Sequence, residues 1–198
     1  MWNLKNKTVV ISGATNGIGK AAAIELSKEN PKLLFTYRNK HLADELLAEI
    51  KALSPDTLVH SVYCDFSKQD SIKKCADEII DLCGNIDVLI NNAGVVNTSY
   101  HETSEGIENT FAVNHLGYFL FTNLLLHKLK GENETRIVNV SSAAHSFVKE
   151  MQWEDINFKN NFGQGLRPYG QSKLANLLFT RYLAIKLSTE NISVNAIH

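Results

Sequence analysis

The sequence predicts an α/β protein in which a Rossmann-type doubly wound parallel sheet lies between two layers of helices. Three observations predict this fold class. Short apolar runs rich in β-branched residues alternate with longer segments of helical periodicity. A glycine-rich turn joins the first apolar run to the first helix, and polar residues follow several later runs, where open parallel sheets bind ligands. At this length we expect one domain over residues 1–198.

Composition argues against several classes of function. With 44% hydrophobic and 21% charged residues the chain is typical of soluble globular proteins, and a net charge of −1 without a Lys/Arg run argues against nucleic-acid binding. Cys64, Cys75 and Cys83 lack metal-ligand spacing, so we expect no metal site, and their odd number fits a reducing compartment. No apolar run is long enough for a transmembrane segment, and the charge at Lys5 leaves no room for a leader or anchor. We therefore expect a cytoplasmic protein.

The first predicted strand, Thr8–Ser12, runs directly into a glycine-rich loop and then a helix over Lys20–Asn30. In this context glycines let the backbone approach a pyrophosphate, and the start of the helix offers it free N–H groups. The candidate cofactor-binding residues of the loop are Gly13, Thr15, Asn16, Gly17, Ile18 and Gly19. The spacing G-x-x-x-G-x-G differs from the common dinucleotide motif, and an ordinary tight turn is the alternative.

The second predicted strand, Leu33–Tyr37, is followed by Arg38 near the point where folds that select NAD place a carboxylate. Arg38 can form charge-assisted hydrogen bonds with a 2′-phosphate, and Lys40 can add to the positive field. This pattern favours NADP (NADPH) over NAD. The alternative is a solvated arginine at a strand end.

Asp65 follows the third predicted strand, Thr57–Cys64, which a helix over His41–Ser54 precedes. Its carboxylate can accept a hydrogen bond from an adenine amino group, or it can serve as a turn or capping residue. The next helix starts with the capping-box-like Ser67–Asp70 and ends at Gly84.

The fourth predicted strand, Asp87–Ile90, leads into two amides and two small residues at positions 91–94. Small residues let the chain pass close to a ligand, which makes Asn92, Ala93 and Gly94 candidates for cofactor binding. A simple turn is the alternative.

The helix predicted over Ser104–Lys130 carries Asn114 in apolar surroundings. A buried asparagine within a helix needs a partner for its amide, and a helical distortion bridged by water would supply one. The helix has enough apolar surface to face both the sheet and a second subunit, so a homodimer is possible. The alternative is that this surface is only core.

The fifth predicted strand, Arg136–Val140, ends in Ser141 and Ser142, whose hydroxyls lie where open sheets bind ligands. Residues 143–168 predict an ordered loop with a short apolar cluster. The aromatic residues of that cluster are Phe147, Trp153, Phe158 and Phe162.

Tyr169 and Lys173 lie four residues apart in a helix predicted over Pro168–Glu190. Residues at this spacing share one face of a helix, so both polar groups point into the same space. An ammonium beside a phenol stabilises the phenolate, which prepares Tyr169 for proton exchange near neutral pH. An amphipathic helix with an ordinary surface lysine is the alternative.

Taken together, these motifs resemble the short-chain dehydrogenase/reductase family over essentially the whole chain. The resemblance rests on Ser12–Gly19, Asp65, Asn91–Gly94, Asn114, the paired serines and Tyr169–Lys173, in this order. Segments 113–119, 136–142 and 172–180 are similar to the retinol-dehydrogenase and WW-domain-oxidoreductase branch of that family.

The resemblance implies a role for each residue. Tyr169 would act as the general acid/base of a carbonyl–alcohol interconversion, and Ser142, more than Ser141, would stabilise the charge that develops on the same oxygen. Lys173 would bind the nicotinamide ribose, and Asn114 would hold a water that connects Lys173 to solvent. The branch implies a small lipophilic substrate, retinal-like or steroid-like.

Relatives of this kind continue past the position of His198 with a turn, a helical segment over the substrate and a seventh strand. We therefore expect a fragment or a truncated form that is C-terminally incomplete. The sixth strand, Ile192–Ile197, then lies at an edge of the sheet. The alternative function is a catalytically silent nucleotide-binding or interaction module.

Overall fold

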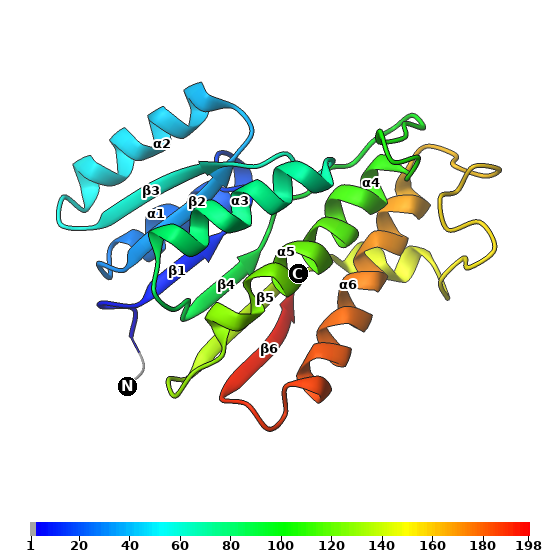
Figure 1. The fold of residues 1–198 in the computed structure, drawn as a ribbon. Coiled ribbons are helices and arrows are strands. Elements are labelled where there is room, and N and C mark those ends of the chain that lie inside the picture. The colour runs from blue at the N-terminus through cyan, green and yellow to red at the C-terminus, as the bar shows by residue number, and fades with distance from the viewer. Residues whose placement is uncertain (1–2) are drawn as a thin grey trace.

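A six-stranded parallel sheet forms the centre of the protein (Figure 1). The computed structural model describes residues 3–198, so the first two residues of the expected domain lie outside the description. The strands are β1 Thr8–Ile11, β2 Lys32–Tyr37, β3 Leu58–Tyr63, β4 Val88–Asn91, β5 Thr135–Val140 and β6 Ile192–Ile197. Their order across the sheet is β3-β2-β1-β4-β5-β6, and every neighbouring pair is parallel. The predicted Rossmann-type fold is confirmed, with β6 at one edge.

Helices cover both faces of the sheet, as the alternating pattern predicts. They are α1 Gly17–Ser27, α2 Lys40–Leu53, α3 Gln69–Leu82, α4 Asn109–Phe111, α5 Gly117–Leu129 and α6 Leu166–Lys186. One core cluster joins α1 and α2 to one face through residues such as Ile11, Phe35 and Leu46. The other joins α3, α5 and α6 to the opposite face through residues such as Leu89 and Phe121. Because β1, β2 and β4 at the centre of the sheet are buried on both faces, their residues read as nearly continuous apolar runs.

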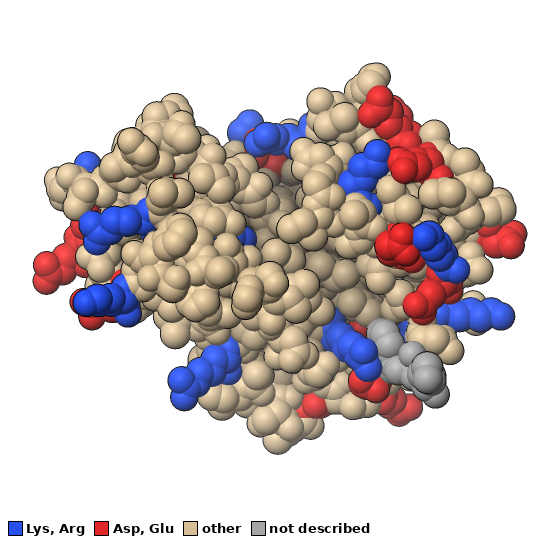
Figure 2. All heavy atoms as spheres, turned by 180° about the vertical axis from the view of Figure 1, so that it is seen from behind, with Lys and Arg blue, Asp and Glu red and all other residues tan. Residues whose placement is uncertain are grey.

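The layer formed by α1 and α2 covers only part of its face. Over β5 and β6 no helix among residues 3–198 covers this face, where Val138 is half-buried and Ser193, Asn195 and Ile197 are exposed. Figure 2 shows the molecule from this side, with charged side chains mainly around the rim and an uncharged middle. The described residues thus form three layers over one half of the sheet and two over the other.

The helix predicted over Ser104–Lys130 begins later than the sequence indicates. Gly106 adopts a φ of 73°, which a right-handed helix does not allow, and the Glu108 carboxylate then accepts hydrogen bonds from the N–H groups of Thr110 and Phe111. Between α4 and α5 the residues Ala112–Leu116 form a π-helical turn. The predicted distortion at Asn114 is therefore present.

Other predicted boundaries also differ from the structure. The helix α1 starts three residues earlier than predicted, because Gly17 and Gly19 already belong to its first turn. The helix α6 runs over Leu166–Lys186 and not Pro168–Glu190, because residues 187–190 form turn hydrogen bonds that lead into β6. The predicted capping box fails, because Ser67 donates its hydroxyl hydrogen to Asp65.

The segment between β5 and α6 is ordered, but only some of its aromatic side chains are buried. Phe158 and Phe162 are buried together, whereas Phe147 and Trp153 are exposed, so half of the predicted cluster is wrong. A 3-10 turn over Ala143–Phe147 brings this segment against α6. The contact is close because a Cβ on Gly170 would lie 2.6 Å from the Ala144 carbonyl oxygen. Glycine at this position therefore allows the 3-10 turn after β5 to approach the start of α6.

Candidate active site

Two adjoining cavities lie at the carboxyl ends of the central strands. The larger, about 500 Å³, extends from the glycine-rich loop to Ser142, Tyr169 and Lys173. The smaller, about 130 Å³, lies between the same loop and the ends of β2 and β3. Gly13, Asn16, Gly94 and Val95 line both cavities. The site is at the switch point between β1 and β4, where the chain reverses its direction across the sheet and open α/β folds bind ligands.

Gly13 is held where a larger residue would not fit. Its φ is 65°, and a Cβ there would lie 2.6 Å from the Cα of Ala93. The Asn92 Nδ2 group donates to the backbone oxygens of Ser12 and Gly13, each at 2.9 Å. The Ser12 hydroxyl in turn accepts from the N–H groups of Asn92 and Ala93. Hydrogen bonds therefore hold the loops after β1 and β4 together, and the two loops form one wall of both cavities.

The amino end of α1 faces the larger cavity and is open to an anion. Its first turn holds no acidic residue, and the Asn16 side chain makes no capping hydrogen bond. Gly17, Ile18 and Gly19 line the larger cavity, and Thr15 lines the smaller one. Free N–H groups and the positive end of the helix dipole favour a phosphate here.

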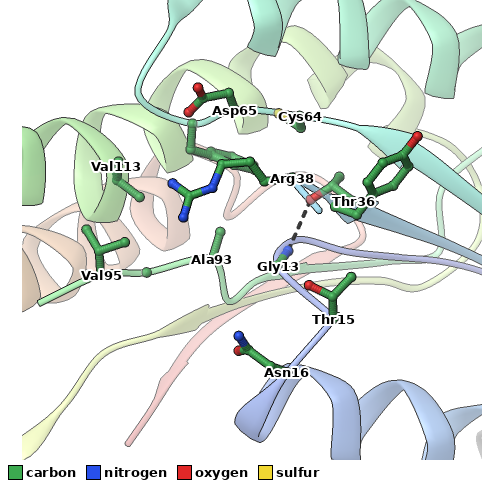
Figure 3. Close-up of a pocket in the computed structure, with 13 residues that line it drawn as sticks. Gly13, Thr15, Asn16, Thr36, Arg38, Cys64, Asp65, Ala93, Val95 and Val113 are labelled. Carbon is green, nitrogen blue, oxygen red and sulfur yellow. Dashed lines mark hydrogen bonds between the residues drawn. The ribbon is translucent and has the colours of Figure 1, made fainter. Parts of the chain in front are cut away.

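Arg38 supplies positive charge to the smaller cavity. Figure 3 shows its side chain extended into this cavity from the end of β2, between Asp65 and Ala93. Lys40, which the sequence also offered, pairs with Asp44 on α2. Of these two cations Arg38 is thus the one that lines the cavity.

Asp65 caps a turn and also lines the smaller cavity, so the turn role is present and the adenine role stays a prediction. Its Oδ1 accepts hydrogen bonds from the Ser67 N–H and hydroxyl groups at 3.1 and 2.7 Å, so it caps a turn. It also lines the smaller cavity. Burial raises the pKa of this carboxyl, but the Ser67 hydrogen bonds, with Lys68 and Arg38 nearby, outweigh burial, and the pKa is lowered. Asp65 is therefore a carboxylate at neutral pH.

Tyr169 and Lys173 both reach the larger cavity from α6. Lys173 is only 3% exposed, and its Nζ donates to the Val140 carbonyl oxygen at 3.0 Å. The ammonium lies 5.5 Å from the centroid of the Tyr169 ring and 5.9 Å from that of the buried Tyr118. Burial lowers the pKa of Lys173 to about 8. A buried ammonium between two phenol rings is unlike the ordinary surface lysine of the alternative interpretation.

The two serines after β5 differ in what their hydroxyls do. Ser141 is buried, and its hydroxyl donates to the Lys173 backbone oxygen at 2.9 Å. Ser142 is half-buried and lines the cavity, and its Oγ accepts from the Ala144 N–H at 3.1 Å. The Ser142 hydroxyl hydrogen therefore stays free to donate into the cavity.

Asn114 is buried and has protein partners for its amide. Its Oδ1 accepts from the Val95 N–H at 2.8 Å, and its Nδ2 donates to the Val95 oxygen at 2.9 Å and to Ser172 Oγ at 3.1 Å. The expected bridging water is not what satisfies this side chain. Asn114 instead links the segment after β4, which lines both cavities, to α6.

Sequence reasoning missed several residues that support the site. They are Ser12, Thr36, Tyr118, Ser172 and Asn176, all buried. The Thr36 hydroxyl oxygen accepts from the Gly13 N–H at 3.0 Å, and the Ser172 hydroxyl donates to the Tyr169 backbone carbonyl oxygen at 2.7 Å. The signal for Ser172 and Asn176 was their position on the same buried helix as Tyr169, where a polar side chain needs a partner.

Comparison with known proteins agrees with this geometry. The family model of the short chain dehydrogenases matches residues 7–154. The chain belongs to the short-chain dehydrogenase family. Members of this family are oxidoreductases that bind nicotinamide cofactors. Human retinol dehydrogenase 13 is 37% identical over 195 residues, which are 98% of this chain and 59% of that protein. The chain thus spans about three fifths of the length of such relatives.

Solved structures with the same fold superpose closely on the chain. An uncharacterised protein from Mycobacterium paratuberculosis has a TM-score of 0.84 and 32% identity, covering 98% of this chain and 68% of that one. A blue fluorescent protein from a metagenomic library, solved in complex with NADPH, has a TM-score of 0.81 and 25% identity, covering 100% of this chain and 75% of that one. Within residues 3–198 the short-chain dehydrogenase fold contains no helix of the length and apolarity that crossing a membrane requires.

The residues of the site fit a nicotinamide dinucleotide of this family. Gly13, where no side chain would fit, lets a ligand approach the backbone closely. The open end of α1 suits its pyrophosphate, and Arg38 suits a 2′-phosphate. Within the described residues no cluster of His, Cys, Asp and Glu forms a metal site.

Proposed function

We propose that the protein is an NADP-dependent oxidoreductase that interconverts a carbonyl and an alcohol on a lipophilic substrate. The observation that carries this proposal is the larger cavity, where Ser142, Tyr169 and Lys173 meet the glycine-rich loop. General acid–base residues beside a nucleotide site form the constellation that hydride-transfer enzymes use.

The cofactor would lie along the loops after β1, β2 and β4. Its pyrophosphate would be held by the start of α1, its 2′-phosphate by Arg38 and its adenine beside Asp65, with Asn92, Ala93 and Gly94 as the opposite wall. Lys173 would hold the nicotinamide ribose. The NADPH named for the blue fluorescent protein, which has the same fold and 25% identity, supports the choice of NADP.

Three side chains would perform the proton chemistry. When bound, NADPH supplies a hydride to the carbonyl carbon. Tyr169 gives its phenolic proton to the carbonyl oxygen, and Ser142 donates a hydrogen bond to that oxygen while negative charge develops on it. The Lys173 ammonium stabilises the tyrosinate that remains, and Asn114 keeps the cavity wall in place. In the oxidation of an alcohol each proton moves in reverse.

Three exposed apolar side chains in the segments that flank Tyr169 support a lipophilic substrate. Val96, Phe147 and Leu166 are 52%, 52% and 54% exposed, respectively. Val96 lines the larger cavity, Phe147 lies against Gly170, and Leu166 follows Gly165, which approaches Asn97. Exposed apolar side chains gathered at the mouth of a polar site favour a ligand with a hydrocarbon part.

The test combines binding and turnover. Fluorescence titration should show NADPH binding, and a panel of aldehydes and ketones of increasing chain length should be reduced with kcat/KM rising with apolar size. A protein that binds no nicotinamide nucleotide contradicts the proposal. NADPH binding with no turnover of any carbonyl or alcohol would instead support the alternative, a catalytically silent nucleotide-binding module.

We also propose that two copies of the chain associate through α5 and α6. These helices lie side by side (Figure 1) and expose the apolar residues Phe119, Leu178, Tyr182 and Ile185. An exposed apolar patch marks an interaction site, and a two-fold dimer is the commonest homo-oligomer. Sedimentation at micromolar concentration tests this, and a monomer at all concentrations contradicts it.

A further inference from the structure

A fully buried asparagine lies one helical turn beyond Lys173. Asn176 is 0% exposed, and its Nδ2 donates to the Asn114 carbonyl oxygen at 2.9 Å and, over a longer 3.5 Å, to the Val140 carbonyl oxygen. The Asn176 Oδ1 is 3.0 Å from Nδ1 of His115. Its amide is thus satisfied on both sides, which burial requires.

The partners of Asn176 fix the orientation of its amide. The Asn114 and Val140 groups are carbonyl oxygens, which only accept hydrogen bonds, so Nδ2 must face them. Oδ1 then faces His115, and the proton between them belongs to His115 Nδ1. Burial lowers the pKa of His115, against the opposing effect of the Asn176 hydrogen bond, so the ring is neutral and its tautomer is set.

Asn176 shares its acceptor with the lysine of the site. The Val140 carbonyl oxygen accepts from Lys173 Nζ at 3.0 Å and from Asn176 Nδ2 at 3.5 Å. The second acceptor of Asn176 is Asn114, in the π-helical turn. One buried amide therefore joins the end of β5, the π-helical turn and α6, the three elements that carry Ser142, Asn114 and Lys173.

We propose that Asn176 is a positioning residue for Lys173, and that His115 fixes the orientation in which Asn176 acts. Without the Nδ2 donor, the Val140 carbonyl would be held by Lys173 alone and the π-helical turn would lose a link to α6. The Lys173 ammonium would then sample positions away from the cavity. This inference rests on the proposed function, because its consequence is weaker contact with the nicotinamide half of NADPH.

The experiment compares two ligands that differ in the nicotinamide half. NADPH reaches the position assigned to Lys173, whereas adenosine 2′,5′-bisphosphate occupies only the adenosine half. Asn176→Asp keeps the shape but loses the donor, and Asn176→Leu removes both polar atoms. For each we expect the Kd of NADPH to rise about tenfold, the effect of losing roughly 1.4 kcal/mol, and the Kd of the bisphosphate to change less than twofold.

A matched control uses another buried asparagine. Asn139 on β5 is also 0% exposed, donates to Thr180 Oγ1 at 2.9 Å and accepts from Asn91 Nδ2 at 2.8 Å. Asn139→Asp makes the same chemical change in the same core, so it should lower thermal stability while leaving both Kd values near those of the parent. If Asn139→Asp raises the Kd of NADPH as much as the Asn176 variants do, the effect comes from a general loss of core stability and the proposal is overturned.

His115 supplies a second, independent arm. The ring packs against Phe111 and Phe179, with centroids 5.2 and 6.1 Å away. His115→Phe preserves a ring but loses the donor, so it should weaken NADPH binding without weakening bisphosphate binding. His115→Asn keeps a donor near the Nδ1 position and should restore NADPH affinity. This arm decides the question if Asn176→Leu does not fold.

Two results separate the failure of this inference from that of the proposed function. If the parent binds both ligands and every Asn176 and His115 variant matches it, the positioning role is wrong while the function stands. If the Asn176 and His115 variants weaken the binding of both ligands equally, the positioning role is also wrong. A parent that binds neither ligand overturns the proposed function and this inference with it.

Discussion

The Lys173 ammonium lies 5.5 Å from the centroid of the Tyr169 ring and donates a hydrogen bond to the Val140 carbonyl oxygen. Burying an ammonium is costly, and its contact with the aromatic ring offsets only part of that cost. The relationship follows from their spacing on α6 and from Gly170, which lets the helix approach the 3-10 turn after β5.

Lys173→Met should stabilise the protein at neutral pH. Burial lowers the pKa of Lys173 from 10.5 to about 8, so the cost of burying its charge is absent above about pH 10.5, grows as the pH falls from about 10.5 to about 8, and is complete below that range. At pH 7 the buried charge therefore opposes folding by about 3 kcal/mol. Thermal melts should show a higher Tm for the variant at pH 7, with the gain shrinking toward pH 10.5.

The control for that melt is Lys74→Met on the exposed side of α3. Its Tm should follow that of the parent at every pH. A variant at Lys173 that is less stable than the parent at pH 7 would show that the ammonium is held for stability and not for chemistry.

Arg38→Asp should reverse the preference for the phosphorylated cofactor. The parent should bind NADPH more tightly than NADH, because Arg38 faces the cavity where an acidic selector would otherwise lie. Loss of one charge-assisted bond, with repulsion added, changes the ratio of the two Kd values by about 10–100-fold. Fluorescence titration at fixed salt measures it, with Lys40→Asp as a charge-matched control. Equal affinities in the parent contradict the assignment.

Ser142→Ala and Ser141→Ala should have different consequences. Ser142 offers a free hydroxyl hydrogen to the cavity, so its loss should lower kcat by roughly 10²–10³-fold, as for other stabilising donors. The Ser141 hydroxyl donates its hydrogen to the Lys173 backbone oxygen and not to the cavity. Its loss should therefore lower the free energy of unfolding by about 1 kcal/mol and lower kcat far less. Comparable losses in kcat for both variants would reject the choice between them.

Gly170→Ala tests the approach of α6 to the 3-10 turn after β5. The added Cβ would lie 2.6 Å from the Ala144 carbonyl oxygen, so the helix or the 3-10 turn must move. We expect a destabilisation of roughly 1–3 kcal/mol and a fall in kcat, because Ser142 and Tyr169 separate. Chemical denaturation gives the first quantity, and a variant with parental stability and turnover would show that the contact is not needed.

The sequence was sufficient for the sheet and for most of the site, because both depend on local signals. Buried parallel strands read as apolar runs, and the glycines of the first loop, Arg38 and the Tyr169–Lys173 pair each occupy a position that the element order defines. The start of α4 was misplaced because the Gly106 turn and the Glu108 cap act over a few residues that otherwise favour a helix.

Long-range partners could not be read in the same way. The amide of Asn114 is satisfied by Val95 and Ser172, and that of Asn176 by His115 and two carbonyls from other elements. Such pairings depend on how α6 packs against the π-helical turn, which no local pattern encodes. The exposure of Phe147 and Trp153 likewise reflects the local path of the segment, not its composition.

Turnover by Tyr169→Phe is the most direct test of the central claim that Tyr169 exchanges the proton. The variant keeps the ring and its contact with Lys173 but has no phenolic hydrogen, so NADPH affinity should remain within about twofold of the parent. Single-turnover measurement with a carbonyl substrate that the parent reduces should then show the loss of general acid catalysis, at least ~10²–10⁴-fold. A Tyr169→Phe variant that binds NADPH normally and reduces the substrate at close to the parental rate would contradict the mechanism.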